Sequence, residues 1–106
     1  MNAVMQSSNE PLLLRSDDQG VTTLTLNRAS QFNSLSDGLI DALQAALDAI
    51  ATDTSVRVVV LAGAGKAFCA GHDLKEMRAA PSLEYYQRLF AQCGRMMMTI
   101  QKLPVP

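Results

Sequence analysis

One stretch of the chain, from Val56 to Met77, limits the possible folds more than any other part of the sequence. It reads VRVVVLAGAGKAFCAGHDLKEM, and its apolar, β-branched run at 58–61 predicts a fully buried strand. Three glycines between positions 63 and 71 follow the strand and allow the backbone to turn sharply. Residues 73–78 then predict the first turns of a helix.

A strand that leads through a glycine-rich loop into a helix gathers several backbone N–H groups around one point. Such a point favours negative charge, either on a bound anion or on an atom that becomes negative during a reaction. Two nucleotide-binding motifs are excluded. A dinucleotide fingerprint starting at Gly63 would need a third glycine where Phe68 stands. A P-loop would need a glycine at Val60 and a serine or threonine at Ala67.

The chain before this stretch predicts two strands and one helix. Residues 12–15 and 21–26 read as strands, and the turn-prone segment 17–20 predicts an antiparallel hairpin between them. After a polar loop, Ser36 is the predicted N-cap of a helix that ends near 51–55. The apolar positions that recur on one face of this helix are Leu39, Leu43, Ala46, Leu47 and Ile50. The order β-β-α-β predicts a crossover unit of the α/β class.

A second helix is predicted after Pro81, with Ser82 as its N-cap. Its apolar stripe consists of Leu83, Tyr86, Phe90, Cys93, Met97 and Ile100, and the run of methionines at 96–98 widens it. A methionine-rich stripe is typical of core packing rather than of a ligand surface. The prolines in the closing segment KLPVP predict that the helix ends there and that an extended segment begins.

Length and composition set the outer limits. A chain of 106 residues is at most one domain, with 1–10 expected as a flexible tail and 11–106 as the folded part. The net charge of -1 gives no reason to expect a nucleic-acid or membrane partner, and no apolar run is long enough to span a bilayer. Two cysteines in an ordinary chain favour a reducing compartment, so a cytoplasmic location is expected. A buried strand with only a hairpin beside it indicates the front part of a larger domain.

Four side chains in this region could carry chemistry. His72 is the only histidine, so no multi-histidine metal site is expected, and its ring either sits beside an important backbone amide or touches a substrate. Cys69 is predicted to be a packed small residue rather than a nucleophile. Glu76 and Glu84 lie on charged helix faces, where a solvated role is more typical than acid–base catalysis.

The stretch from Val56 to Met77 closely resembles the signature of the crotonase superfamily, the enoyl-CoA hydratase/isomerase family. The resemblance extends to residues 21–35, where the predicted strand is followed by NRASQFNSL, which is similar to the Asn-Arg-Pro loop and Asn-Ala/Ser-Leu turn of that family, with Ala29 in place of the usual proline. The closing KLPVP is similar to the Lys-Pro that precedes the next strand of the family. Several motifs therefore occur in the expected order with the expected gaps.

The resemblance implies an α/β fold, the crotonase-like ββα spiral (ClpP/crotonase fold), of which this chain would be only the N-terminal part. Family members bind acyl-CoA thioesters and commonly assemble as trimers or hexamers. No separately bound cofactor is implied, because coenzyme A enters as part of the substrate. Fatty acid metabolism, and β-oxidation in particular, is the expected setting.

The resemblance also implies a set of site residues. Family members stabilise an enolate-like oxyanion with two backbone N–H groups, and the first of these corresponds to the N–H of His72. The residues expected along the pantetheine and thioester are Ala70, Gly71, His72, Asp73, Leu74 and Lys75. Gln31, Asn33 and Ser34 match the loop that runs beside CoA. Lys75 either reaches a CoA phosphate or is a solvated helix lysine.

The second oxyanion donor and the acid–base glutamates of the family lie beyond the position that matches residue 106, and neither Glu76 nor Glu84 matches them. The isolated chain is therefore expected to be inactive. Three functions remain open: hydration of a 2-enoyl-CoA, double-bond isomerisation or thioester hydrolysis on the same fold, and a non-catalytic acyl-CoA-binding or oligomer-forming module.

Overall fold

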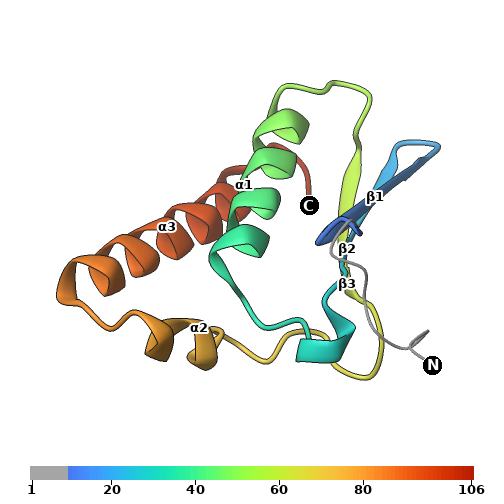
Figure 1. The fold of residues 1–106 in the computed structure, drawn as a ribbon. Coiled ribbons are helices and arrows are strands. Elements are labelled where there is room, and N and C mark those ends of the chain that lie inside the picture. Colours follow the sequence, from blue (N-terminus) through green and yellow to red (C-terminus); the bar gives the residue numbers. More distant parts are fainter. Residues whose placement is uncertain (1–9) are drawn as a thin grey trace.

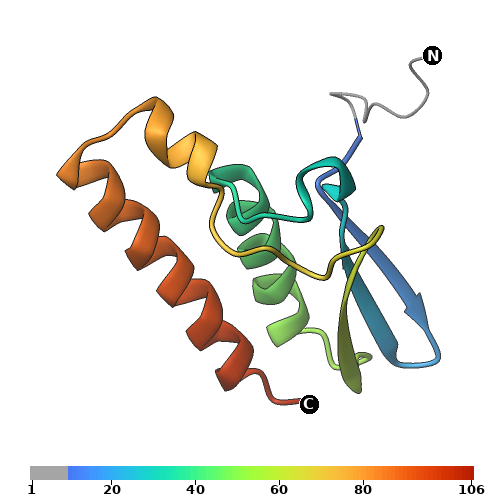
Figure 2. The same ribbon diagram turned by 90° about the horizontal axis from the view of Figure 1, so that it is seen from below.

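A computed structural model describes residues 10–106 of the chain. Nearly all of the expected tail at 1–10 therefore lies outside the described residues. The described part has one sheet and three α-helices, and helix α1 (Asp37–Ala51) lies between the sheet and helix α3 (Leu83–Lys102) (Figures 1 and 2). The short helix α2 (Leu74–Ala79) leads into α3. This arrangement places α1 at the centre of the core.

The predicted hairpin is present. Strand β1 (Leu13–Asp18) pairs antiparallel with β2 (Val21–Leu26), with Asp18 opposite Val21. The strand β1 continues through the first half of the predicted turn, so only Gln19 and Gly20 connect the two strands. Both have positive φ, 50° and 86°, as in the two-residue hairpin turn whose twist matches that of the strands.

The predicted crossover is also present, because β2 pairs in parallel with β3 (Val58–Gly63) after the chain has passed through α1. The sheet of the described residues has the order β1-β2-β3. Leu26 and Gly63 are opposite each other at the carboxyl ends of the two parallel strands. The two loops that follow these strands, 27–36 and 64–73, therefore start side by side.

The prediction that the run at 58–61 is fully buried was wrong. Val60 is 43% exposed, and the other residues of β3 are half-buried. Parallel strands are buried when helices cover both faces of the sheet, and α1 and α3 cover only one (Figure 2). The outer edge of β3 meets only the last residue, where the Val59 N–H donates to the Pro106 carbonyl at 2.9 Å.

Helix α1 begins as predicted, because the Ser36 hydroxyl accepts a hydrogen bond from the Leu39 N–H at 3.2 Å. This bond satisfies one of the amide donors that have no partner within the helix. The apolar residues buried on α1 are Leu39, Ile40, Leu43, Leu47 and Ile50. They include the predicted face except Ala46, which is half-buried, and they add Ile40.

Ser82 caps α3 as predicted, accepting from the Tyr85 N–H at 3.0 Å, but the predicted apolar stripe of α3 is partly wrong. Three of its members are exposed: Leu83 (72%), Phe90 (51%) and Met97 (46%). The buried residues are Leu89, Cys93 and Met96. Cys93 belongs to two rows of apolar residues with helical spacing, one with Phe90 and Met97 and one with Leu89 and Met96. The second row packs against α1 and is buried.

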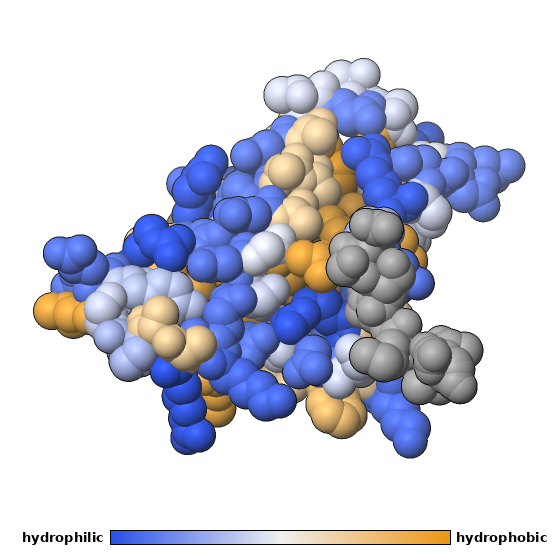
Figure 3. All heavy atoms as spheres, in the orientation of Figure 1, coloured by the Kyte–Doolittle hydropathy of each residue, from blue (hydrophilic) through white to orange (hydrophobic). Residues whose placement is uncertain are grey.

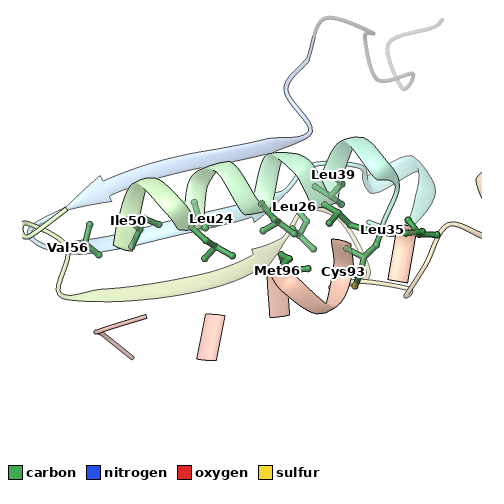
Figure 4. Close-up of a cluster of buried hydrophobic side chains, with 12 residues drawn as sticks. Leu24, Leu26, Leu35, Leu39, Ile50, Val56, Cys93 and Met96 are labelled. Carbon is green, nitrogen blue, oxygen red and sulfur yellow. The ribbon is translucent and has the colours of Figure 1, made fainter. Parts of the chain in front are cut away.

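The core joins β2, α1 and α3 (Figure 4). Leu24, Leu39, Ile40 and Leu47 have no exposed surface. Apolar atoms also reach the surface between α1 and the sheet and at the corner where α2 joins α3 (Figure 3). Within residues 10–106, none of the helices combines the length and apolar character needed to cross a membrane.

Two methionines on α3 test the corrected stripe. Met96→Ala should lower the free energy of unfolding by about 2–5 kcal/mol, because it leaves a cavity at a side chain that is 2% exposed. The matched change Met98→Ala, at a side chain that is 48% exposed, should cost only about 0.5 kcal/mol. Urea unfolding of both variants measures the difference, and equal losses would show that the assigned face is wrong.

Candidate functional site

The two loops at the carboxyl ends of β2 and β3 are joined by backbone hydrogen bonds. The Leu35 N–H donates to the Gly71 carbonyl at 2.7 Å, and the Asp73 N–H donates to the Leu35 carbonyl at 3.0 Å. These two bonds form an isolated parallel bridge between Leu35 and His72. A third bond, from the Ala70 N–H to the Phe32 carbonyl at 3.0 Å, joins the loops at a point three residues before Leu35.

The bridge determines the direction of the His72 N–H. The Gly71 carbonyl and the His72 N–H belong to the same peptide group, and a trans peptide points them in opposite directions. Because the carbonyl faces Leu35, the N–H points away from it. Among the hydrogen bonds of residues 10–106, none uses this N–H as its donor. It is thus a donor of fixed direction without a hydrogen-bond partner in this part of the chain.

Gly71 allows this geometry, because its φ of 92° lies in the region that residues with a Cβ rarely adopt. The predicted helix after the loop is present but short, and α2 spans only six residues. The donor strength of the site therefore depends on the orientation of the His72 peptide rather than on a helix dipole, which needs several aligned turns.

Asp73 is held on two sides. One carboxylate oxygen accepts from the Arg28 guanidinium at 3.0 Å, and the other accepts from the Glu76 N–H at 3.1 Å and caps α2. The Arg28 and Asp73 side chains are only 16% and 12% exposed. Arg28 also donates to the carbonyl and hydroxyl oxygens of Ser34, at 2.6 and 3.1 Å. The sequence showed no sign of this contact, because Arg28 and Asp73 are separated by 45 positions.

Asn33 is fully buried and joins the loops through its side chain. Its amide donates to the carbonyls of Ala64 and Ala67, at 2.9 and 2.8 Å, and its oxygen accepts from the Arg28 N–H at 2.8 Å. The side chains of Asn33 and Ser34 are thus occupied within the protein. Their predicted contact with CoA stays a prediction. Because these bonds engage both side chains, we expect any such contact to involve the backbone of the loop.

The His72 ring lies against α3. It contacts the Phe90 ring edge to face, with 5.2 Å between the centroids and 75° between the planes. The His72 Nδ1 is buried without a hydrogen-bond partner. Asp73 does not orient the ring, since Arg28 and the start of α2 occupy its carboxylate. Whether the ring also touches a substrate stays open.

The prediction of a solvated Glu76 was wrong. Its side chain is half-buried, and its carboxylate accepts from the N–H of Asp37, the first residue of α1, at 2.8 Å. Glu76 therefore joins α2 to the start of α1, an interaction between residues 39 positions apart that no local pattern indicates. Glu84 is exposed, as predicted.

Cys69 packs against the core, as predicted, and is half-buried. It borders an apolar cavity of about 140 Å³ between β3, α1 and α3, with Leu61 and Met97 among the other lining residues. Burial raises the pKa of the Cys93 thiol, with a smaller contribution from Cys69. Residues 10–106 hold no cluster of three or more His, Cys, Asp or Glu side chains suited to a metal ion.

The remaining residues predicted to contact the substrate lie on the surface. Leu74 is 63% exposed, and Ala70, Gly71 and Lys75 are exposed beside it. Gln31 is exposed at the end of the short 3₁₀ helix Ala29–Gln31. The bonds between the loops place both groups at the same end of the sheet. Their contact with CoA is a prediction that this geometry permits.

A comparison with protein families decides the relationship. Residues 16–106 match the family described as Enoyl-CoA hydratase/isomerase. The chain belongs to this family. The matched region contains both loops and the Leu35–His72 bridge, so the geometry above is that of a family member.

Individual relatives agree with this assignment. The chain is 32% identical over 106 residues to the enoyl-CoA hydratase domain-containing protein 3, mitochondrial, of Xenopus laevis, covering all of this chain and 36% of that protein. It is 40% identical over 65 residues to the 1,2-epoxyphenylacetyl-CoA isomerase of Escherichia coli strain K12, covering 61% of this chain and 25% of that protein. Each alignment spans little more than a third of the relative, or less.

Solved structures confirm the fold. A crystal structure of an enoyl-CoA hydratase from Mycobacterium smegmatis is 61% identical, with a TM-score of 0.89 over 92% of this chain and 38% of that one. The predicted crotonase fold is therefore correct for the part of the domain that the chain contains.

The Arg28–Asp73 contact should make stability depend on pH. Burial by itself raises the pKa of Asp73, but the Glu76 N–H and the Arg28 guanidinium lower it by more, so the net pKa lies below the ordinary 3.8. The unfolded chain then binds protons at a higher pH than the folded one. This contribution to stability is present above about pH 4 and is lost as the pH falls through the lowered pKa.

Asp73→Asn should therefore reduce the free energy of unfolding at pH 7 by about 1.5–3 kcal/mol, the range for hydrogen bonds to charged groups. The difference from the unchanged chain should shrink towards pH 2, as measured by urea unfolding across this range. Asp18→Asn on the hairpin is the control. A difference for Asp73→Asn that is the same at every pH would contradict the assignment.

Proposed function

We propose that this chain forms the CoA-thioester-binding front part of an acyl-CoA enzyme of its family, with the His72 N–H as one donor of an oxyanion hole. The observation that supports this most directly is the bridge that turns the His72 N–H away from Leu35 and leaves it unbonded. A fixed donor with no internal partner suits an oxygen that becomes negative during reaction.

The proposed reaction is addition of water to a 2-enoyl-CoA. The oxygen of water bonds to C3 and gives up a proton to a base, and the electrons of the double bond move onto the thioester oxygen, which gains negative charge. The enolate is then protonated at C2. A donor already aimed at that oxygen stabilises the enolate without any rearrangement, and removal of one such donor typically costs about 100- to 1,000-fold in rate. The acid–base glutamates and the second donor are proposed to come from sequence that follows the part matched here.

Isomerisation of an acyl-CoA is the second candidate, because it forms the same type of enolate and needs the same donor. The E. coli relative, 40% identical over 65 residues, is named as a 1,2-epoxyphenylacetyl-CoA isomerase, so it supports isomerase chemistry on a CoA thioester but not movement of a double bond in particular. Thioester hydrolysis and a non-catalytic acyl-CoA-binding module are weaker candidates. The number of glutamates facing the thioester carbons in the complete enzyme would separate them: two favour a hydratase, one an isomerase and none a binding module.

The assembly and location of the protein stay predictions. The family resemblance implies a trimer or hexamer, and the two cysteines favour a cytoplasmic setting; no contact in the described residues bears on either. The same holds for a role in fatty acid β-oxidation. An acyl-CoA substrate without a separately bound cofactor is part of the proposal.

The His72 N–H can be removed selectively. We suggest a hybrid enzyme in which this chain replaces the corresponding third of the M. smegmatis enoyl-CoA hydratase, which is 61% identical to it. An ester in place of the peptide bond between residues 71 and 72 should lower kcat for crotonyl-CoA by about 100- to 1,000-fold. The N–H donors of the bridge, those of Leu35 and Asp73, belong to other peptides, but the Gly71 carbonyl becomes an ester carbonyl, a weaker acceptor. Amide hydrogen exchange at Leu35 therefore checks that the bridge is retained in the ester form.

His72→Ala is the matched control, because it keeps the N–H and removes the ring. It should retain kcat within about tenfold, well short of the loss of an oxyanion donor. A hybrid whose ester form is as active as the unchanged one would contradict the role of this N–H.

The isolated 106-residue chain should show no turnover of crotonyl-CoA. Measurable turnover would show that the second oxyanion donor and the acid–base glutamates are not needed.

A further inference from the structure

The Arg28 side chain spans the two loops on both sides of the bridge. One guanidinium nitrogen donates to the Ser34 carbonyl at 2.6 Å and to the Ser34 hydroxyl at 3.1 Å. The other donates to the Asp73 carboxylate at 3.0 Å. Ser34 directly precedes Leu35, and Asp73 directly follows His72. Arg28 therefore holds the neighbours of both residues that form the bridge.

The backbone of Arg28 is itself fixed. Its N–H donates to the Asn33 side chain at 2.8 Å, and Asn33 is anchored to Ala64 and Ala67 of the other loop. The guanidinium thus projects from a rigid base, and its side chain is only 16% exposed. A planar fork with several donors can bind two acceptors at once, whereas a lysine ammonium acts as a single point.

We propose that Arg28 is a positioning residue for the oxyanion donor: by tying Ser34 to Asp73, it sets the direction of the His72 N–H without touching the substrate. This inference rests on the proposed function, because it assigns Arg28 a role in that same site. It assigns the Arg28–Asp73 pair a part in catalysis in addition to its part in stability. An N–H that tilts away from the thioester oxygen stabilises the enolate less in the transition state.

The test uses Arg28→Lys and Arg28→Gln in the hybrid with the M. smegmatis enzyme. Lysine keeps the charge and glutamine keeps a shorter polar group, but neither can hold both acceptors in the same way. Both variants should lower kcat for crotonyl-CoA by up to about 100-fold, the cost of a displacement of about 1 Å at a reacting centre, while KM changes little. Arg15→Gln is the matched control, because Arg15 lies on the hairpin and pairs with Asp17 of the same strand and with Asp53 in the loop after α1.

A second measurement does not depend on activity. Amide hydrogen exchange at Leu35 and Asp73 reports the two bonds of the bridge, and exchange in the central strand β2 reports overall stability. In Arg28→Lys the protection of Leu35 and Asp73 should fall by about tenfold or more, while that of β2 stays as in the Arg15→Gln control.

The outcomes separate the two proposals. If the unchanged hybrid has no acyl-CoA activity, the proposed function fails, and the exchange measurement still tests whether Arg28 holds the bridge. Loss of kcat with selective loss of protection at Leu35 and Asp73 supports the positioning role. Unchanged kcat in both variants, a rise in KM alone, or equal loss of protection in β2 and the bridge overturns it.

Discussion

The hydrogen bond from the Leu35 N–H to the Gly71 carbonyl, at 2.7 Å, is the interaction on which the site depends. It orients a single peptide group, and because that group is planar and trans, the His72 N–H must point the opposite way. The positive φ of Gly71 allows the turn, and Asp73 closes the bridge from the other side. A donor fixed in this way needs no reorganisation when a negative charge develops, which is the condition for strong electrostatic stabilisation.

This bond lies where the segment that leads into α1 meets the segment that leads into α2. Leu35 is buried and is followed at once by Ser36, which caps the central helix α1. Glu76 of α2 accepts from the first amide of α1, so the helix that follows His72 is tied to the helix that follows Leu35. The core of β2, α1 and α3 therefore supports both sides of the bridge. The exposed edge of β3 and the exposed apolar residues of α3 agree with a chain that spans little more than a third of its relatives.

Local patterns predicted the elements well, because the signals that define them are local. The caps at Ser36 and Ser82 and the hairpin of β1 and β2 are confirmed. Predictions failed where distant packing decides. The buried face of α3 includes Leu89 rather than Phe90, since two rows of apolar residues had acceptable spacing. Glu76 and the Arg28–Asp73 contact depend on partners 39 and 45 positions away, and no periodicity indicates such pairs. A family resemblance points to the His72 donor, and the three-dimensional structure shows why its N–H points away from Leu35.

The central claim is that the His72 N–H binds the thioester oxygen of an acyl-CoA. The most direct measurement is a crystal structure of the hybrid enzyme with a bound, unreactive acyl-CoA analogue. We expect the thioester oxygen at about 2.7–3.1 Å from the His72 nitrogen, with the Leu35–Gly71 bond intact. An analogue whose thioester oxygen binds elsewhere, or a His72 N–H that turns inward to bond within the protein, would contradict it.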